Sequence, residues 1–222
     1  MQTLHMQPVR TRPFGAAQPR QQQAPRRAHA ARRAVRVAAS VAGAVTKRPT
    51  EGAAKAAFLA ANPDTMDSCL ALLKNAATTK GVQPELVEGA LVWLEDSVGG
   101  QSSGVESIDG SWRLVFSTST SIRFFQYIPV KEDLIVDTSK GAISLESEVG
   151  PFRFVIGGAI GGWRAAAGEL DFQFKQVDIL LFGNKIWTVT PATKPKTYTF
   201  FFVGNRVSAA RSSAGGLSLL LR

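Results

Sequence analysis

The chain has 222 residues, a hydrophobic content of 45% and a formal net charge of +9. Residues 1–50 carry ten of the 26 Lys and Arg residues and none of the 17 Asp and Glu residues, so residues 51–222 have a net charge of −1. Because neutralisation of phosphates requires clustered cations, this balance argues against nucleic acid as a partner of the folded part of the chain.

The N-terminal segment has the composition of a targeting sequence. Residues 1–40 are rich in Arg, Ala, Gln and Pro and lack acids and a long apolar stretch, which is typical of a transit peptide and unlike a secretory signal. We predict cleavage near 37–40, among small residues, and a flexible linker over 41–63. The alternative is a basic arm that stays attached and binds RNA or anionic lipid. No apolar run approaches the roughly 20 residues of a membrane span, so we expect a soluble or peripheral protein.

Two amphipathic helices are predicted between residues 64 and 98. Gly81 ends the first, and Pro84 suits the first turn of the second. Cys69 is the one cysteine, which excludes an intrachain disulfide, and we expect it to be a small buried hydrophobe. The apolar residues at helical spacing are Met66, Cys69, Leu70 and Leu73 in the first helix and Val87, Ala90, Leu91, Leu94 and Val98 in the second.

From residue 108 to residue 222 the apolar pattern changes to a period of two, which indicates strands. The segment Leu170–Phe174 is the clearest case, because Leu and Phe alternate there with Asp and Gln. Gly, Pro and Asn separate eight or nine such segments. The pattern therefore predicts a mainly β fold, with one antiparallel sheet closed into a barrel, or else a sandwich, preceded by the two α-helices.

Residue types for most catalytic and metal chemistry are missing from this part of the chain. The two histidines, His5 and His29, lie in the predicted transit peptide, and Cys69 stands alone. We therefore predict no catalytic triad, no zinc or iron–sulfur site and no cofactor. The glycine-rich segment Gly157–Trp163 lacks the Gly-Lys-Ser/Thr ending of a phosphate loop, and we expect it to bend a strand.

Carboxylates leave one enzymatic alternative open. Glu146 and Glu148 lie two residues apart on one strand face, whereas Asp109 and Asp171 are isolated in the sequence. Each is expected to face solvent, but carboxylates distant in the sequence can meet in space, as in glycosidases. A carboxylate-based hydrolase or isomerase inside the barrel is therefore kept as an alternative.

Large apolar side chains recur on one face of many predicted strands. Such residues either fill the interior of a small barrel or enclose one apolar ligand, and the sequence does not separate these two outcomes. The candidates for the barrel interior or a lipid-binding site are Trp112, Leu114, Phe116, Phe154, Phe172, Phe174, Tyr198 and Phe200.

The first predicted strand begins with Gly110-Ser111-Trp112, the G-x-W pattern that starts lipocalin-type barrels. In those barrels an Arg near the last strands covers the Trp, because a guanidinium is attracted to the electron-rich ring face. Gly110 and Trp112 are therefore expected to close the barrel together with Arg206 or Arg211. A buried Trp112 would act mainly in stability.

Five segments resemble the plastid lipid-associated protein family, also called fibrillins, and the resemblance spans residues 64–222. Gly110, Trp112 and Arg113 fit its first-strand motif. The chain departs from the family at Gly204-Asn205, where acidic residues are frequent. Arg211, Gly215 and Gly216 fit its C-terminal motif. The segments are "LLKNAATTKGV" (Leu72–Val82), "IDGSWRLVFST" (Ile108–Thr118), "FFQYIPVKE" (Phe124–Glu132), "GPFRF" (Gly150–Phe154) and "AARSSAGGLSLLL" (Ala209–Leu221).

The resemblance implies a lipocalin-like barrel in a chloroplast protein at plastoglobules, thylakoids or in the stroma. It also implies a non-enzymatic function, the binding or organisation of prenyl lipids, quinones, carotenoids or acyl chains. The expected partners are a hydrophobic small molecule and a peripheral membrane or lipid-droplet surface. The second hypothesis is an adaptor that delivers a lipid substrate to a plastid biosynthetic enzyme.

Overall fold

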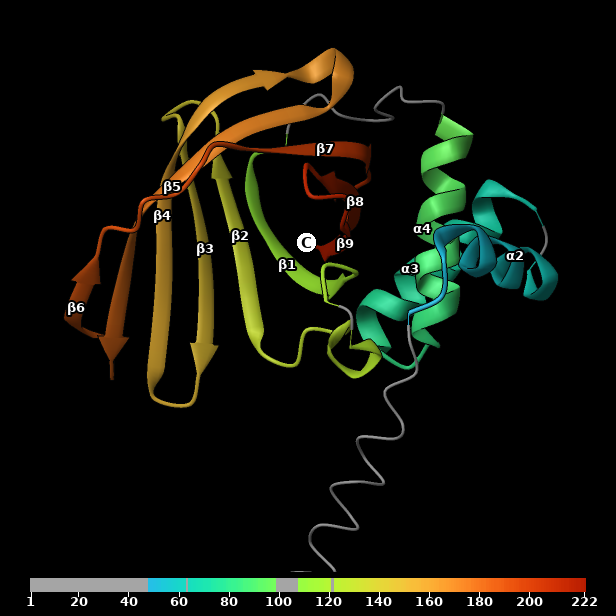
Figure 1. Ribbon diagram of the computed structural model, residues 1–222, viewed down its shortest axis with the longest axis horizontal. Coiled ribbons are helices and arrows are strands. Elements are labelled where there is room, and N and C mark those ends of the chain that lie inside the picture. The colour runs from blue at the N-terminus through green and yellow to red at the C-terminus, as the bar shows by residue number, and fades with distance from the viewer. Residues whose placement is uncertain (1–47, 63, 99–107, 121) are drawn as a thin grey trace, which may run out of the picture. The chain divides into compact units, whose positions relative to one another are not determined.

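The computed structural model describes residues 48–62, 64–98, 108–120 and 122–222 (Figure 1). The predicted transit peptide and its cleavage region lie outside these residues. The described chain is mainly β and contains a closed antiparallel barrel of eight strands, with three helices before it in the sequence. The predicted fold class is thereby confirmed.

The helices α3 (Met66–Thr79) and α4 (Pro84–Val98) are the two that the sequence predicted. The side-chain oxygen of Thr65 caps α3 by accepting a hydrogen bond from the backbone N–H of Ser68 at 3.2 Å. Cys69 is fully buried, and burial raises the pKa of its thiol to about 12, as expected of an inert buried side chain.

A third helix, α2 (Glu51–Ala61), occupies 11 residues of the segment 41–63 that was predicted to be a flexible linker. That prediction is wrong for these residues. Thr50 caps the helix, and the fully buried Ala54 and Phe58 pack it onto α4. The two helices meet at Gly89, where a Cβ would lie 2.0 Å from the carbonyl oxygen of Ala54, so only glycine fits.

The strands form one sheet in the order β4–β3–β2–β1–β9–β8–β7–β5–β6, and pairing of β4 with β5 closes the barrel. Every pair is antiparallel, and two short 3-10 turns, Arg123–Phe125 and Ala165–Ala167, interrupt the strand sequence. The strands are β1 (Gly110–Ser117), β2 (Lys131–Asp137), β3 (Ala142–Val149), β4 (Phe152–Arg164), β5 (Glu169–Leu181), β6 (Asn184–Val189), β7 (Lys196–Val203), β8 (Val207–Ser212) and β9 (Leu217–Leu221).

The long strand β5 belongs to the barrel at one end and to an open sheet at the other. Its residues Glu169–Phe172 pair with β7, whereas Val177–Leu181 pair with β6. Strand β6 therefore extends the sheet beyond the closed barrel, and it lies at the left edge of Figure 1, away from the helices. The half of β5 that pairs with β6 is therefore not paired with β7.

The glycines of Gly157–Trp163 bend β4 as predicted. Pairing with β5 shifts register between Gly157 and Gly158 and again between Ile160 and Gly162. A Cβ on Gly158 would lie 2.4 Å from the carbonyl oxygen of Gln173, so the two backbones approach too closely for any other residue.

The apolar core is divided in two by the barrel wall. One part lies between the helices and the outer face of β1, β7, β8 and β9, and the other lies inside the barrel. The interior core is built around Trp112, Phe172 and Phe200. The larger buried side chains of the helix-facing core are Phe58, Leu73, Leu91, Leu94, Phe116, Phe201, Leu217 and Leu219.

Candidate functional site

One row of side chains follows the inner face of the sheet from the buried core to its open edge. Residues directly opposite one another in antiparallel strands stand on the same face, so the register identifies this row. Since Trp112 lies inside the barrel, every member of the row points inward. The row is Trp112, Leu134, Leu145, Ile156, Val177 and Val189.

The exposure of the inward side chains increases along this row. Trp112 at one end of the row is fully buried, whereas Val189 at the other end is 43% exposed. Trp187, which stands opposite Ile179 on the same inner face, is 66% exposed. We call the accessible part of the inner face the apolar wall. It comprises the half-buried Phe154, Ile156, Val177 and Ile179 together with Trp187 and Val189.

The opposite face of the same strands carries charged and polar side chains beside the half-buried Val155 and Leu180. Asp178 alternates with the wall residues of β5, and its carboxylate accepts hydrogen bonds from the ammonium of Lys185 at 2.8 Å and the hydroxyl of Thr188 at 2.6 Å. These contacts hold the pKa of Asp178 at about 2. The open sheet is therefore amphipathic, with its apolar side turned toward the barrel interior.

An apolar rim borders the wall at the turns of two neighbouring hairpins. The backbone N–H of Phe182 donates to the carbonyl of Pro151 at 3.0 Å, which holds the β5–β6 turn beside the β3–β4 turn. Phe182 is 79% exposed, and Val149 and Phe152 are also exposed. We call these three residues the apolar rim.

Two polar side chains face the same interior, of which Tyr198 was among the predicted interior residues and Glu132 was not. Glu132 shares the inner face of β2 with Leu134, and Tyr198 packs against the interior core. Burial raises the pKa of both groups, and the charge of Glu132 raises the pKa of Tyr198 further. The strict alternation of Glu132, Leu134 and Val136 was the signal that could have identified Glu132.

Most of the predicted interior residues lie inside the barrel. Phe154 belongs to the apolar wall instead of the enclosed core. The ring of Phe172 meets the ring of Tyr198 edge-on, with centroids 5.1 Å apart. The predicted residues that belong to the interior core or pack against it are Trp112, Leu114, Phe172, Phe174, Tyr198 and Phe200.

The prediction that Phe116 lies inside the barrel is wrong, because its side chain points outward to the helix-facing core. A shift in the β1–β9 register between Leu114 and Phe116 breaks the alternation and turns Phe116 toward the helices. There its ring contacts Tyr127 edge-on at 5.2 Å between centroids. Phe116 therefore stabilises the contact between barrel and helices.

The prediction that Arg206 or Arg211 covers Trp112 is also wrong. Arg222, and neither Arg206 nor Arg211, places its guanidinium carbon 4.0 Å from the centre of the ring. Arg211 instead binds Glu95 on α4, with its Nε 2.7 Å from a carboxylate oxygen. Gly110 lies beside the guanidinium of Arg222 with φ of +118°, a conformation that favours glycine.

We expect Arg222→Met to lower the free energy of unfolding by about 1–2 kcal/mol, because it removes the cation–π contact and a hydrogen bond to the carbonyl of Asp109. The matched control is Arg206→Met, whose exposed side chain should change stability by less than about 0.5 kcal/mol. Urea unfolding measures both. Equal effects of the two substitutions would contradict the assignment of Arg222 as the covering residue.

The four carboxylates considered for catalysis do not meet. Asp109 accepts hydrogen bonds from the N–H and hydroxyl of Thr138 at 2.6 and 2.8 Å. The other three lie in separate ion pairs, which are Glu146–Arg153, Glu148–Lys131 and Asp171–Arg164. Among the described residues, no group of three or more His, Cys, Asp or Glu could hold a metal ion.

No family model, curated protein or solved structure matches the chain. Of the helices that the structure describes, none combines the length and the apolar character needed to cross a membrane.

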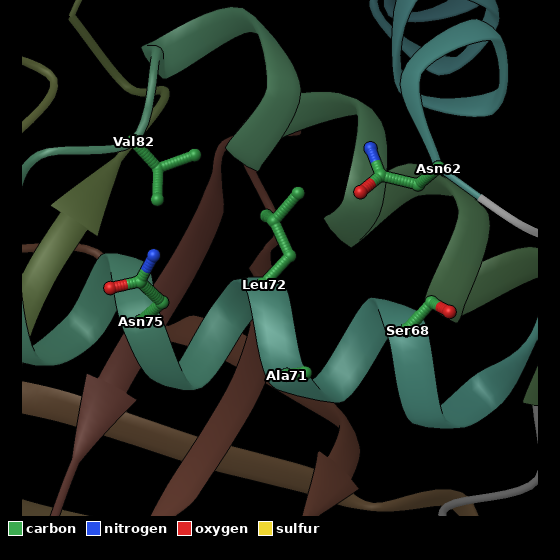
Figure 2. Close-up of a pocket in the computed structure, with 6 residues that line it drawn as sticks. All are labelled: Asn62, Ser68, Ala71, Leu72, Asn75 and Val82. Atoms are coloured by element: carbon green, nitrogen blue, oxygen red, sulfur yellow. The ribbon is translucent and has the colours of Figure 1, made fainter.

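A second concave feature lies on the helices. It is a cleft of about 470 Å³ that is largely open to solvent, and Figure 2 shows Leu72 of α3 pointing into it between Asn62 and Val82. Its remaining lining residues are Ser68, Ala71 and Asn75. Three of its six lining residues, Asn62, Ser68 and Asn75, are polar, whereas the apolar wall consists of apolar side chains alone, so the wall is the stronger candidate site.

Proposed function

We propose that the protein binds a hydrophobic molecule of the lipid class against the apolar wall, without catalysing a reaction. One observation carries this proposal, which is that six apolar side chains share an inward face and yet remain accessible. Burial of a large apolar side chain contributes roughly 2 kcal/mol, so a ligand that covers several of them gains ample free energy.

The polar outer face of the same strands supports this reading. Asp178, Lys185 and Thr188 give this face charged and polar side chains, although the half-buried Leu180 also lies on it. Contiguous apolar surface on a protein commonly marks a binding site. The separate outer ion pairs of the candidate carboxylates favour a non-enzymatic function.

We further propose that the protein acts in plastids at the surface of a lipid particle or thylakoid, with the apolar rim in contact with that surface. The resemblance of residues 64–222 to plastid lipid-associated proteins and the composition of residues 1–40 support this location. Prenyl lipids, quinones, carotenoids and acyl chains are the ligand classes that the resemblance suggests.

The adaptor hypothesis has one observation in its favour. Strand β6 is an edge strand, paired only with β5, and its far edge can accept a strand of a partner protein. A clean organic extract of the purified protein, together with no binding of an apolar probe, would favour a protein partner over a lipid.

The wall is tested by placing a charge on each face of β5. Ile179→Asp should weaken binding of the neutral fluorescent probe N-phenyl-1-naphthylamine at least about tenfold, because a carboxylate loses its water when an apolar ligand covers it. Leu180→Asp is the matched control, since Leu180 is equally half-buried but faces outward between Arg153 and Lys185. Fluorescence titration of the full chain measures both. No binding by the unmodified protein, or equal loss in the two variants, would overturn the proposal.

A further inference from the structure

Glu132 is the one inward-facing acid on β2. Its neighbours point outward and are paired, Lys131 with Glu148 at 3.2 Å and Asp133 with Arg113. Because side chains alternate along a strand, Glu132 stands on the inner face with Leu134. Its inner-face neighbours include Leu134 on the same strand and Ser147 directly opposite on β3, and burial raises the pKa of its carboxyl.

Tyr198 presents its hydroxyl to the same interior from the other side of the barrel. Tyr198 on β7 stands directly opposite Leu170 of the interior core, so it projects into the same barrel interior as Glu132, although β2 and β7 are not neighbours in the sheet. Edge-on contacts with Phe172 at 5.1 Å and Phe200 at 6.3 Å hold the tyrosine ring in place. The two polar groups therefore face a common space from fixed positions.

Neither group has a hydrogen-bond or ion-pair partner within the part of the chain that the structure describes. Two serines of the barrel, in contrast, have hydrogen-bond partners within the protein. The hydroxyl of Ser208 donates to the carbonyl of Phe202 at 3.0 Å, and that of Ser212 accepts from the N–H of Gly216 at 3.1 Å. A hydrophobic ligand that displaces water from this interior would have to satisfy Glu132 and Tyr198, because polar groups that lose their hydrogen bonds on burial are costly.

Resting on the lipid-binding function above, we propose that Glu132 and Tyr198 form a head-group site that selects a neutral amphiphile with a hydroxyl group. A hydroxyl both donates and accepts, so it can donate to the carboxylate of Glu132 and accept from the phenol of Tyr198. The hydrocarbon chain of the ligand then lies along the apolar wall. The site thereby defines one polar end and one apolar end of the ligand.

This arrangement discriminates against the two other common lipid types. A pure hydrocarbon or an ether offers no donor, so it leaves the carboxylate of Glu132 without a hydrogen bond. A fatty acid brings a second negative charge to a site where the described residues supply no pairing cation. A site built to hydrogen-bond a polar group rejects an analogue that lacks it, because its own groups are left unpaired.

Displacement of N-phenyl-1-naphthylamine from the full chain tests the head-group site with three probes of equal chain length. Tetradecanol should displace the probe at a concentration at least about tenfold lower than tetradecyl methyl ether, as expected for a hydrogen bond to a charged group. Tetradecanoate should be the weakest of the three.

Glu132→Leu should abolish the preference for the alcohol, and Glu132→Gln should remove the discrimination against tetradecanoate. The matched control, Glu148→Leu, alters a carboxylate on the outer face and should change neither. Retained binding of N-phenyl-1-naphthylamine shows that each variant is folded. Equal displacement by alcohol and ether, or equal behaviour of Glu132→Leu and Glu148→Leu, would overturn the head-group site and leave the apolar wall standing. Failure of the unmodified protein to bind N-phenyl-1-naphthylamine would overturn both.

Discussion

Trp112→Ala is expected to lower the free energy of unfolding by about 3–5 kcal/mol, measured by urea unfolding. The ring is fully buried in the interior core, so its removal leaves a cavity that the surrounding strands cannot fill. The substitution also removes the hydrogen bond that the indole nitrogen donates to the carbonyl of Ile108 at 2.8 Å, and the surface on which Arg222 rests.

Trp187→Ala is the matched control, because the same residue type stands on the same inner face but is 66% exposed. We expect it to change the unfolding free energy by less than about 1 kcal/mol, since little apolar area is lost from the core. It should instead weaken the binding of N-phenyl-1-naphthylamine. If the Trp112→Ala variant kept the melting temperature of the unmodified protein and lost only the binding of N-phenyl-1-naphthylamine, Trp112 would contact the ligand. The prediction that it acts mainly in stability would then be wrong.

Alternation of apolar and polar residues was sufficient to predict most of the barrel. In β5 the pattern around Phe172 assigns the inner and outer faces correctly, because a strand has a fixed period of two. The same rule failed for Phe116, because one bulge in β1 reverses the face of the residues after it. A bulge depends on the partner strand, so the sequence of β1 does not reveal it.

Other differences between the predicted and the observed structure depend on contacts between residues distant in the sequence. Three arginines, Arg206, Arg211 and Arg222, lie near the last two strands, and only the register between β8, β9 and β1 determines that Arg222 reaches Trp112. The Ala-rich α2 resembles a linker in composition, although Thr50 as a cap and Phe58 as an anchor were local signals for a helix.

The candidate site was only partly visible in the sequence. Strand β6 has the pattern of an ordinary barrel strand, and its departure from the barrel depends on which half of β5 it joins. This departure is what leaves Trp187 accessible. The charged neighbours Lys131 and Asp133 give the segment around Glu132 the composition of a solvated strand end. The alternation of Glu132 with Leu134 nevertheless places Glu132 on the inner face.

Loss of the ion pair between Arg48 and Glu88 is expected to destabilise the protein strongly. The side chain of Glu88 on α4 is 1% exposed, and the guanidinium of Arg48 approaches its Oε1 to 2.8 Å. Arg48 also donates to the carbonyl of Thr118 at 3.0 Å, just after β1. The pair therefore joins the segment before α2 to both the helices and the barrel.

Arg48→Met is expected to lower the free energy of unfolding by about 3 kcal/mol or more, because it leaves the carboxylate of Glu88 buried without a counter-charge. The other oxygen of that carboxylate, Oε2, already has no hydrogen-bond partner among the described residues. The double variant Arg48→Met with Glu88→Met should recover most of the loss, since well-packed apolar side chains often replace a buried ion pair at little cost. Urea unfolding of the four proteins gives the coupling energy between the two positions. Additive losses in the double variant would mean that each residue stabilises the protein through other contacts and that the buried charge is not the cause.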